Sequence, residues 1–355
     1  MTKKPAPTVD DEFTRWALEA ARRVADKNAP PIAAGTRTGQ RLRGVSALVD
    51  AQGVTRMTWV KTGRVEDDPD AFLQLYREAL DDYPVKRVKS ARAPKCDTKD
   101  LLAVYPMGDP HIGMYSWAPE TGANFDTKIA ESRLVAAVDH LVEVAPACEQ
   151  ALIINLGDFF HADNNSGVTT RSGARLDVDG RWAKVLAVGL RTLHRCIDRA
   201  LQKHKRVRVI CEIGNHDDHS SVMLALALNE RYRNEPRVQI DTSPSPFHWH
   251  EFGQCLIGTT HGNGPKLEKL GGIMAHDQPE AWGRTQHRLW YVGHFHHQRV
   301  LELPGCTVEV FRTLAPRDAW ANQAGYRSGQ SMVCDVLHRD YGRECRHEIG
   351  IGRLQ

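Results

Sequence analysis

The chain has 355 residues, of which 47 are Lys or Arg and 44 are Asp or Glu, so its formal net charge is +3. Hydrophobic residues make up 41% and charged residues 26%, values close to those of globular proteins, which excludes a wholly disordered or fibrous chain. The near balance of charge predicts no strong attraction of the whole molecule to nucleic acid, so any such binding must come from a local patch.

Neither a membrane segment nor a disulfide framework is expected. No run approaches the roughly 18 apolar residues of a membrane span, and residues 1–5 precede no apolar stretch. The eight cysteines are scattered singly without a CxxC pair, so we expect reduced thiols. We therefore expect a cytoplasmic protein with no membrane partner.

Residues 1–98 form a predicted accessory region. An amphipathic helix is expected over 10–27, a linker over 28–40, a β-hairpin around residues 50–53 and a second helix over 69–83. The basic stretch 85–99 could contact phosphate or could serve as a solvated linker.

Residues 99–355 form the second predicted domain. Apolar runs of strand length there alternate with helical segments, which indicates an α/β fold. The pattern predicts further strands within 299–311 and 330–351, closing in a hairpin at 340–342. The other expected elements are strands over 101–107, 151–156, 207–213, 238–240, 255–260 and 289–292, and helices over 126–144, 180–204 and 220–231.

Polar clusters follow five of these strands, at the end where open α/β sheets usually bind ligands. Each cluster places metal-type ligands after a small residue or directly after the apolar run. A lone Asp-x-His or His-x-His is more often structural, but five ordered clusters are not readily explained in that way. The clusters are Gly108-Asp109-Pro110-His111, Gly157-Asp158-Phe159-Phe160-His161, Gly214-Asn215-His216-Asp217, His261-Gly262-Asn263 and Gly293-His294-Phe295-His296.

These donors favour transition metals. Carboxylate, imidazole and amide oxygen together suit Mn²⁺, Fe²⁺ or Zn²⁺ better than Ca²⁺ or Mg²⁺, which prefer all-oxygen sites. There are too many ligands for one ion and a natural number for two. Two cations about 3.5–4 Å apart can clamp a phosphoryl group and activate a water. We expect two divalent ions, with Mn²⁺ favoured.

The ordered set resembles the motifs of the calcineurin-like metallophosphoesterase superfamily, over residues 100–351. The resemblance implies a sandwich of two mixed β-sheets flanked by helices, with the small α+β region of residues 1–98 added. It also implies that Asp158 bridges the two metals, that His216 is the general acid or steadies the phosphate, and that Asp217 orients its ring. The first metal would be held also by Asp109, His111 and His296, and the second by Asn215, His261 and His294.

His161 occupies a position where many relatives carry Asp, and in this the chain is similar to SbcD-type repair nucleases. There the extra histidine supports phosphodiester cleavage on DNA, and a second imidazole can stabilise charge on the leaving oxygen. The chain is also similar to phage- and prophage-encoded metallophosphoesterases, which implies a bacterial or phage-infected host cell. The long stretch 164–179 and the unmatched residues 1–98 depart from the nuclease pattern.

The resemblance favours a DNA exo- or endonuclease, with nucleic acid as partner and a homodimer expected. The alternatives are a phosphomonoesterase or small-nucleotide phosphodiesterase and, third, an inactive scaffold. Arg171 and Arg175 could reach a phosphate or lie in a solvated loop. The mixture of cations and rings after the last motif suits single-stranded nucleic acid or a structural lip. Its members are Arg312, Arg317, Trp320, Tyr326 and Arg327, whereas His219, His276 and His297 have no assigned place.

Overall fold

The computed structural model describes residues 40–49, 55–64 and 98–354, in a chain that divides into two units, Met1–Glu78 and Ala79–Gln355. In the first unit, β1 (Gln40–Val49) pairs antiparallel with β2 (Thr55–Arg64), which confirms the expected hairpin strands. The helices predicted over 10–27 and 69–83, the linker over 28–40 and nearly all of the basic stretch 85–99 lie outside the described residues.

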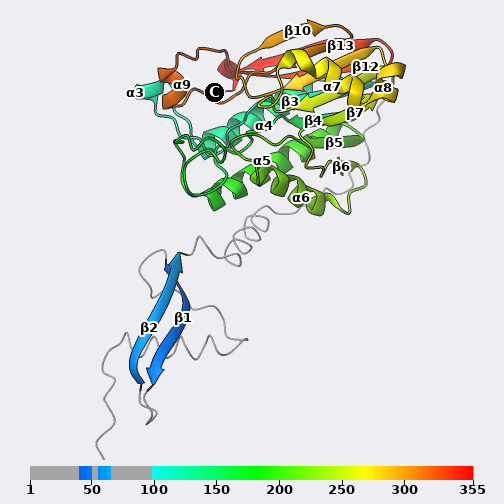
Figure 1. Ribbon diagram of the computed structural model, residues 1–355. Coiled ribbons are helices and arrows are strands. Elements are labelled where there is room, and N and C mark those ends of the chain that lie inside the picture. The colour runs from blue at the N-terminus through cyan, green and yellow to red at the C-terminus, as the bar shows by residue number, and fades with distance from the viewer. Residues whose placement is uncertain (1–39, 50–54, 65–97, 355) are drawn as a thin grey trace, which may run out of the picture. The chain divides into compact units, whose positions relative to one another are not determined.

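The second unit is built on two mixed β-sheets (Figure 1). The larger sheet has the order β13-β12-β3-β4-β5-β6, in which β3 to β6 run parallel and β12 pairs antiparallel with both β3 and β13. Its strands are β3 (Thr98–Met107), β4 (Cys148–Asn155), β5 (Arg206–Cys211), β6 (Val238–Ile240), β12 (Ser331–His338) and β13 (Gly342–Gly350).

The smaller sheet has the order β10-β11-β9-β8-β7, with β8, β9 and β11 parallel and an antiparallel strand at each edge. Its strands are β7 (His248–Phe252), β8 (Cys255–Thr260), β9 (His287–Val292), β10 (Arg299–Leu303) and β11 (Cys306–Val310). β7 was not predicted, since its sequence His-Trp-His-Glu-Phe has no continuous apolar run.

The main core lies between the two sheets. Leu152 and Ile154 of the larger sheet and Ile257 and Tyr291 of the smaller sheet belong to one buried cluster. A second cluster lies on the outer face of the smaller sheet, where Trp290 packs with Met274. Both sheets are therefore buried on two faces, which explains why their strands read as continuous apolar runs.

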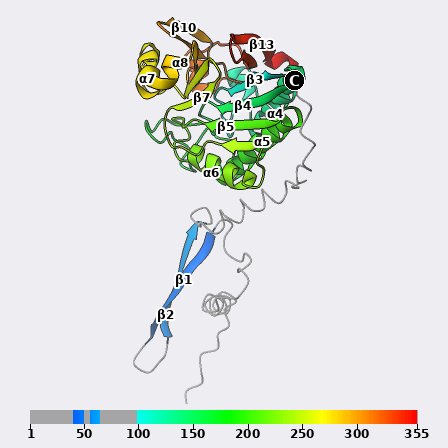
Figure 2. The same ribbon diagram turned by 90° about the vertical axis from the view of Figure 1, so that its right-hand side faces the viewer.

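Helices cover the outer faces (Figures 1 and 2). The N-cap of α4 is Asp126, whose side chain accepts from the Ile129 N–H. The helices on the larger sheet are α4 (Thr127–Val144), α5 (Trp182–Lys203) and α6 (Ser220–Tyr232), and those beside the smaller sheet are α7 (Leu270–Asp277) and α8 (Pro279–Arg284). The predicted sandwich of two mixed sheets flanked by helices is confirmed.

Smaller features complete the described unit. The short helices α3 (Ala118–Thr121) and α9 (Ala319–Gln323) contact each other, and 3₁₀ turns lie at Leu267–Lys269 and Ile351–Arg353. Every described cysteine is a free thiol, as expected. Among the helices described, none combines the length and apolar character that crossing a membrane requires.

Candidate metal centre

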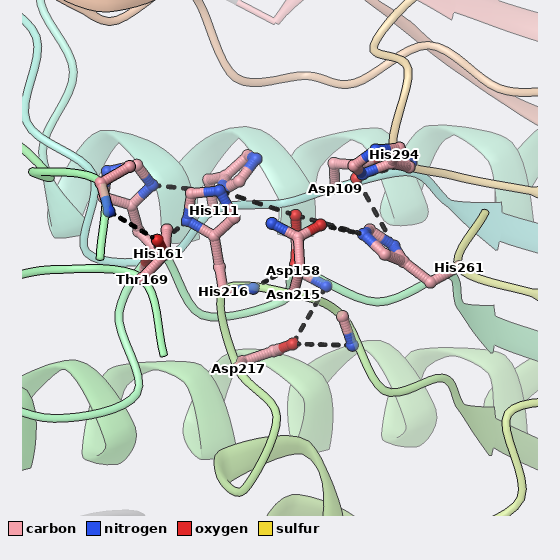
Figure 3. Close-up of polar contacts among 12 residues, drawn as sticks. Asp109, His111, Asp158, His161, Thr169, Asn215, His216, Asp217, His261 and His294 are labelled. Atoms are coloured by element: carbon pink, nitrogen blue, oxygen red, sulfur yellow. Dashed lines mark hydrogen bonds and ion pairs between the residues drawn. The ribbon is translucent and has the colours of Figure 1, made fainter. Parts of the chain in front are cut away.

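The five predicted clusters meet at one end of the sandwich (Figure 3). Three clusters follow the parallel strands β3, β4 and β5 of the larger sheet, and two follow β8 and β9 of the smaller sheet. Because the carboxyl ends of parallel strands share an edge, segments about 185 residues apart deliver side chains to one place. His111 Nε2, for example, lies 3.0 Å from His296 Nε2.

Among the residues that the structure describes, three groups of three side chains have donor atoms close enough to share a cation: two contain a carboxylate, and the third consists of His111, His161 and His216. Asp109, His111 and His296 form the first group, and Asp158, His261 and His294 form the second, with all donor atoms of a group within 4.8 Å of one another. Each of these two groups combines one carboxylate with two imidazoles, the donor set of a first-row transition metal. The assignment of the two carboxylate-containing groups to two separate ions stays a prediction.

Asn215 and Asp158 both lie close to the ring of His261. His261 Nε2 is 3.1 Å from Asn215 Oδ1 and 3.3 Å from Asp158 Oδ2, so Asn215 joins the second group. His261 Nδ1 is 3.8 Å from Asp109 Oδ1, which brings the two groups into contact. The bridging role of Asp158 itself stays a prediction.

The backbone is strained at these ligands. In the described part of the chain, the non-glycine residues with positive φ are Asp109, His111, Asp158, His294 and His296, at 44° to 68°. Such a conformation costs about 1–3 kcal/mol per residue and persists only where the surroundings enforce it. All five are predicted ligands, so the fold stores strain to aim donor atoms at common centres.

The electrostatics fit a cation. Asp109 and Asp158 are buried, and their described ion pairs are all with histidines. Burial raises the pKa of Asp109 to about 8. Burial alone would lower the pKa of His261, but the carboxylates of Asp158 and Asp109 raise the pKa of this imidazole to about 10. A proton on this imidazole therefore offsets the buried negative charge, and a bound cation would replace it.

A backbone carbonyl orients the ring of His261 in the way that is usual for metal-binding histidines. Its Nδ1 lies 2.8 Å from the Leu156 carbonyl oxygen, which can only accept, so Nδ1 carries the hydrogen and Nε2 is free to coordinate. Metal-bound histidines almost always donate their second N–H in this way. The donor chemistry and this support fit a divalent metal.

His161 and His216 stack beside the first group, with ring centroids 5.1 Å apart. His216 Nδ1 donates to the His161 carbonyl oxygen at 2.9 Å, which leaves Nε2 facing Asp158 at 3.9 Å. His161 is buried, and its Nε2 has no hydrogen-bond partner. Burial lowers the pKa of His161 to about 3, so the ring is neutral with an unsatisfied nitrogen beside the centre.

Asp217 has a different contact from the one that the resemblance implied. Its carboxylate accepts from the backbone N–H groups of Gly214, Asp158 and Phe160 at 3.0–3.2 Å, whereas the ring of His216 is held by the His161 carbonyl. The expectation that Asp217 orients the ring of His216 is corrected accordingly. Asp217 instead ties the loop after β4 to the loop after β5, and so positions Asp158.

Gly214 leaves no space for a side chain. A Cβ there would lie 2.1 Å from Asp158 Oδ1 and 2.2 Å from Asp158 N. We expect Gly214→Ala to displace the Asp158 carboxylate and to weaken Mn²⁺ binding about 10- to 100-fold, the cost typical of losing support for a ligand. Calorimetric titration with Mn²⁺ measures this affinity. Gly264→Ala, where a Cβ meets nothing within 4 Å, is the matched control, and equal affinities in both variants would contradict the assignment.

The long stretch 164–179 carries Arg171 and Arg175, the two arginines that could reach a phosphate. Arg171 Nη2 pairs with Asp218 Oδ1 at 2.7 Å, and Arg175 is exposed in a backbone bridge with Val168. Sequence reasoning missed Asp163, a buried carboxylate that accepts from the backbone and side chain of both His219 and Ser220. No spacing signal marked it, because its partners lie 56 and 57 residues away.

The three unassigned histidines lie outside the ligand groups. His219 pairs with Asp163, His276 is exposed beside Asp277, and His297 is exposed with its Nδ1 on the Phe295 carbonyl oxygen. His297 is therefore separate from the ligand groups although it adjoins His296 in sequence.

Comparisons with known proteins give matches at low similarity. No protein-family model matches the sequence, and no curated protein does. A predicted phosphoesterase from Streptococcus pneumoniae is 11% identical over 70% of this chain and 98% of its own, with a TM-score of 0.28. Vps29 of Entamoeba histolytica, complexed with zinc, is 11% identical over 70% and 99%, with a TM-score of 0.30. Vps29 of Cryptosporidium parvum is 14% identical over 72% and 100%, with a TM-score of 0.33. At these scores the likeness is too low to assign a function.

Proposed function

We propose that this protein is a metal-dependent phosphodiesterase that cleaves nucleic acid, with DNA as the favoured substrate. The observation that carries the proposal is the contact between two carboxylate–imidazole groups, each with donor atoms within 4.8 Å, at one end of an α/β sandwich. Nucleic acid is favoured over a simple phosphate ester because His161 adds a second imidazole next to His216.

Two divalent cations at this centre would bind the phosphoryl group and activate a water as the nucleophile. The residues that would hold the first ion are Asp109, His111 and His296, and those for the second are Asp158, His261, His294 and Asn215. Nitrogen and oxygen donors of this kind suit Mn²⁺, Fe²⁺ or Zn²⁺. Asp217 holds the Asp158 loop in place through its backbone contacts.

The two remaining imidazoles act on the leaving group. His216 Nε2 faces the centre, because its Nδ1 is committed to the His161 carbonyl oxygen, and as an imidazolium the ring would donate its Nε2 proton to the departing oxygen. A donor nitrogen of His161 lies within 4.8 Å of those of His111 and His216, and its Nε2 has no hydrogen-bond partner, so this ring could contact the phosphoester. Cleavage of a diester develops negative charge on the leaving oxygen, and a second ring there would help to stabilise that charge.

A second candidate is a phosphodiesterase or phosphomonoesterase for small nucleotides. A cavity of about 210 Å³ beside His296 favours it, because this volume is below the roughly 300–1,000 Å³ of sites that enclose drug-sized ligands. An inactive scaffold is disfavoured by the full set of ligands.

The two candidates are separated by substrate. With Mn²⁺ added, end-labelled single- and double-stranded DNA is compared with bis-nitrophenyl and mono-nitrophenyl phosphate. We expect cleavage of DNA and of the bis-ester. Turnover of the mono-ester with DNA left intact would establish the small-substrate alternative.

His161→Ala should lower turnover of the phosphodiester about 10²- to 10⁴-fold, the contribution typical of a positioned acid–base group, while bound metal stays near the wild-type amount. The reason is that His161 is not needed to complete either three-ligand group that contains a carboxylate. Steady-state kinetics and metal analysis measure the two quantities. His297→Ala, an exposed histidine next to a ligand, is the control and should change neither. A metal-free His161→Ala protein would make His161 a ligand instead.

A further inference from the structure

Two segments far apart in sequence form one lobe next to the metal centre. Residues 115–125 carry α3 and residues 315–330 carry α9, and we call them together the α3–α9 lobe (Figure 1). Ser116 Oγ donates to the Arg317 carbonyl oxygen at 2.9 Å, Arg317 Nη2 donates to the Thr121 carbonyl oxygen at 2.9 Å, and Asn322 Nδ2 donates to that of Glu120 at 2.9 Å. The lobe is thus fixed by long-range contacts.

The cavity of about 210 Å³ opens within this lobe and reaches the first ligand group. Its lining includes His296 and Thr313, and Thr313 Oγ donates to the Asp109 carbonyl oxygen at 2.6 Å. Tyr326, Ala321 and Gln330 line it from the α9 side, and residues 121–123 from the α3 side. A phosphate held at the centre would therefore have this cavity next to it.

Exposed aromatic side chains concentrate on the lobe. Among the described residues, the large exposed aromatic side chains are Tyr115, Trp117, Trp320, Tyr326 and Tyr341, and all but Tyr341 belong to the lobe. The rings of Trp320 and Tyr326 lie 5.7 Å apart and are tilted by 39°. Leaving aromatic rings in water is unfavourable, so a cluster of them next to a cavity indicates a binding surface for flat apolar groups.

The two arginines of the lobe donate hydrogen bonds to backbone carbonyl oxygens within it. Arg317 donates to the carbonyl oxygens of Thr121 and Tyr326, and Arg327 donates to those of Asn322 and Tyr326. The remaining lining offers hydroxyl, amide and backbone groups with one tyrosine ring. These are partners for an uncharged ring with polar edges rather than for a second phosphate.

We propose that the α3–α9 lobe binds a nucleobase of a single-stranded substrate, which stacks on Tyr326 while the adjoining phosphate lies at the metal centre. This inference rests on the proposed function, and it names the form of nucleic acid that the site takes. A base inside a duplex is stacked and paired, so it enters the cavity only after it leaves the helix. Single strands and frayed ends meet this requirement directly.

The test compares binding of two probes with equal backbone charge. One is a fluorescein-labelled hexathymidylate with phosphorothioate linkages, which resist hydrolysis, and the other is an abasic hexamer with the same linkages. Fluorescence anisotropy with the Mn²⁺-loaded full chain gives both dissociation constants. Stacking of one base strengthens binding by a factor of about 5 to 100. The wild-type protein should therefore bind the thymidylate at least about fivefold more tightly than the abasic hexamer.

Tyr326→Leu should bring the ratio of the two constants close to one, and Tyr326→Phe should retain it, because the ring is kept. Tyr341→Leu is the matched control, since Tyr341 is an exposed aromatic residue outside the lobe, and its ratio should equal that of wild type. Thermal unfolding of each variant verifies that it is folded.

The outcomes distinguish the two proposals. Equal binding of the probes by wild type, or an unchanged ratio in Tyr326→Leu, overturns the base-binding lobe and leaves the phosphodiesterase proposal standing. Absence of Mn²⁺ binding together with absence of bis-nitrophenyl phosphate hydrolysis overturns the proposed function, and this inference with it.

Discussion

Asp158→Asn should remove Mn²⁺ from the second ligand group and lower turnover of a model phosphodiester by more than about a hundredfold. Loss of a residue that merely supports a metal ligand typically costs about 10- to 100-fold, and Asp158 is itself the carboxylate of its group. The amide keeps the shape of the side chain but supplies no negative charge to balance a cation. His261 Nε2, 3.3 Å away, then faces a neutral group.

Metal content per chain and steady-state kinetics measure this effect. Asp179→Asn is the control, because Asp179 is also a hydrogen-bonded carboxylate, but it accepts from Thr127 at the start of α4 rather than lying at the centre. We expect the control to retain the wild-type metal content. An Asp158→Asn protein with full metal content and full turnover would show that the carboxylate does not hold an ion.

Strands were predicted well wherever both faces of a sheet are buried. The strand over Cys255–Thr260 was predicted to the residue, since all six of its side chains are buried and its sequence is a continuous apolar or small run. Edge strand β7 escaped prediction because His248, His250 and Glu251 interrupt any such run. The short helices α7 and α8 escaped because each is shorter than the window in which helical periodicity can be recognised.

The candidate ligands were predictable because parallel strands bring their carboxyl ends together, so a polar cluster after each strand is enough to place them. The contacts that fix these ligands were not predictable. Asp217 accepts from three backbone N–H groups on two loops, and only the folded geometry shows this. The α3–α9 lobe likewise depends on the bond from Arg317 to Thr121, across 196 positions of sequence.

An ionic cluster with two buried carboxylates, Asp335 and Glu309, joins the two sheets. Arg346 on β13 donates to both oxygens of Asp335 on β12, at 2.6 and 2.9 Å, and to both oxygens of Glu309 on β11, at 2.5 and 2.8 Å. Arg343 also pairs with both carboxylates, and the Tyr291 hydroxyl donates to Asp335 at 2.8 Å. Burial opposes ionisation of Glu309, yet the two arginines hold the pKa of Glu309 below its usual value.

Arg346→Met should therefore lower the free energy of unfolding by about 3–5 kcal/mol, because two buried carboxylates lose their main partner. Urea unfolding monitored by circular dichroism measures the change. Arg284→Met is the matched control: Arg284 makes a similar two-point contact with Glu251, but on the surface, where such a pair contributes about 0–1 kcal/mol. If both variants lost the same small free energy of unfolding, the ionic cluster between the sheets would contribute no more than a solvent-exposed pair. Apolar packing alone would then hold the sandwich together.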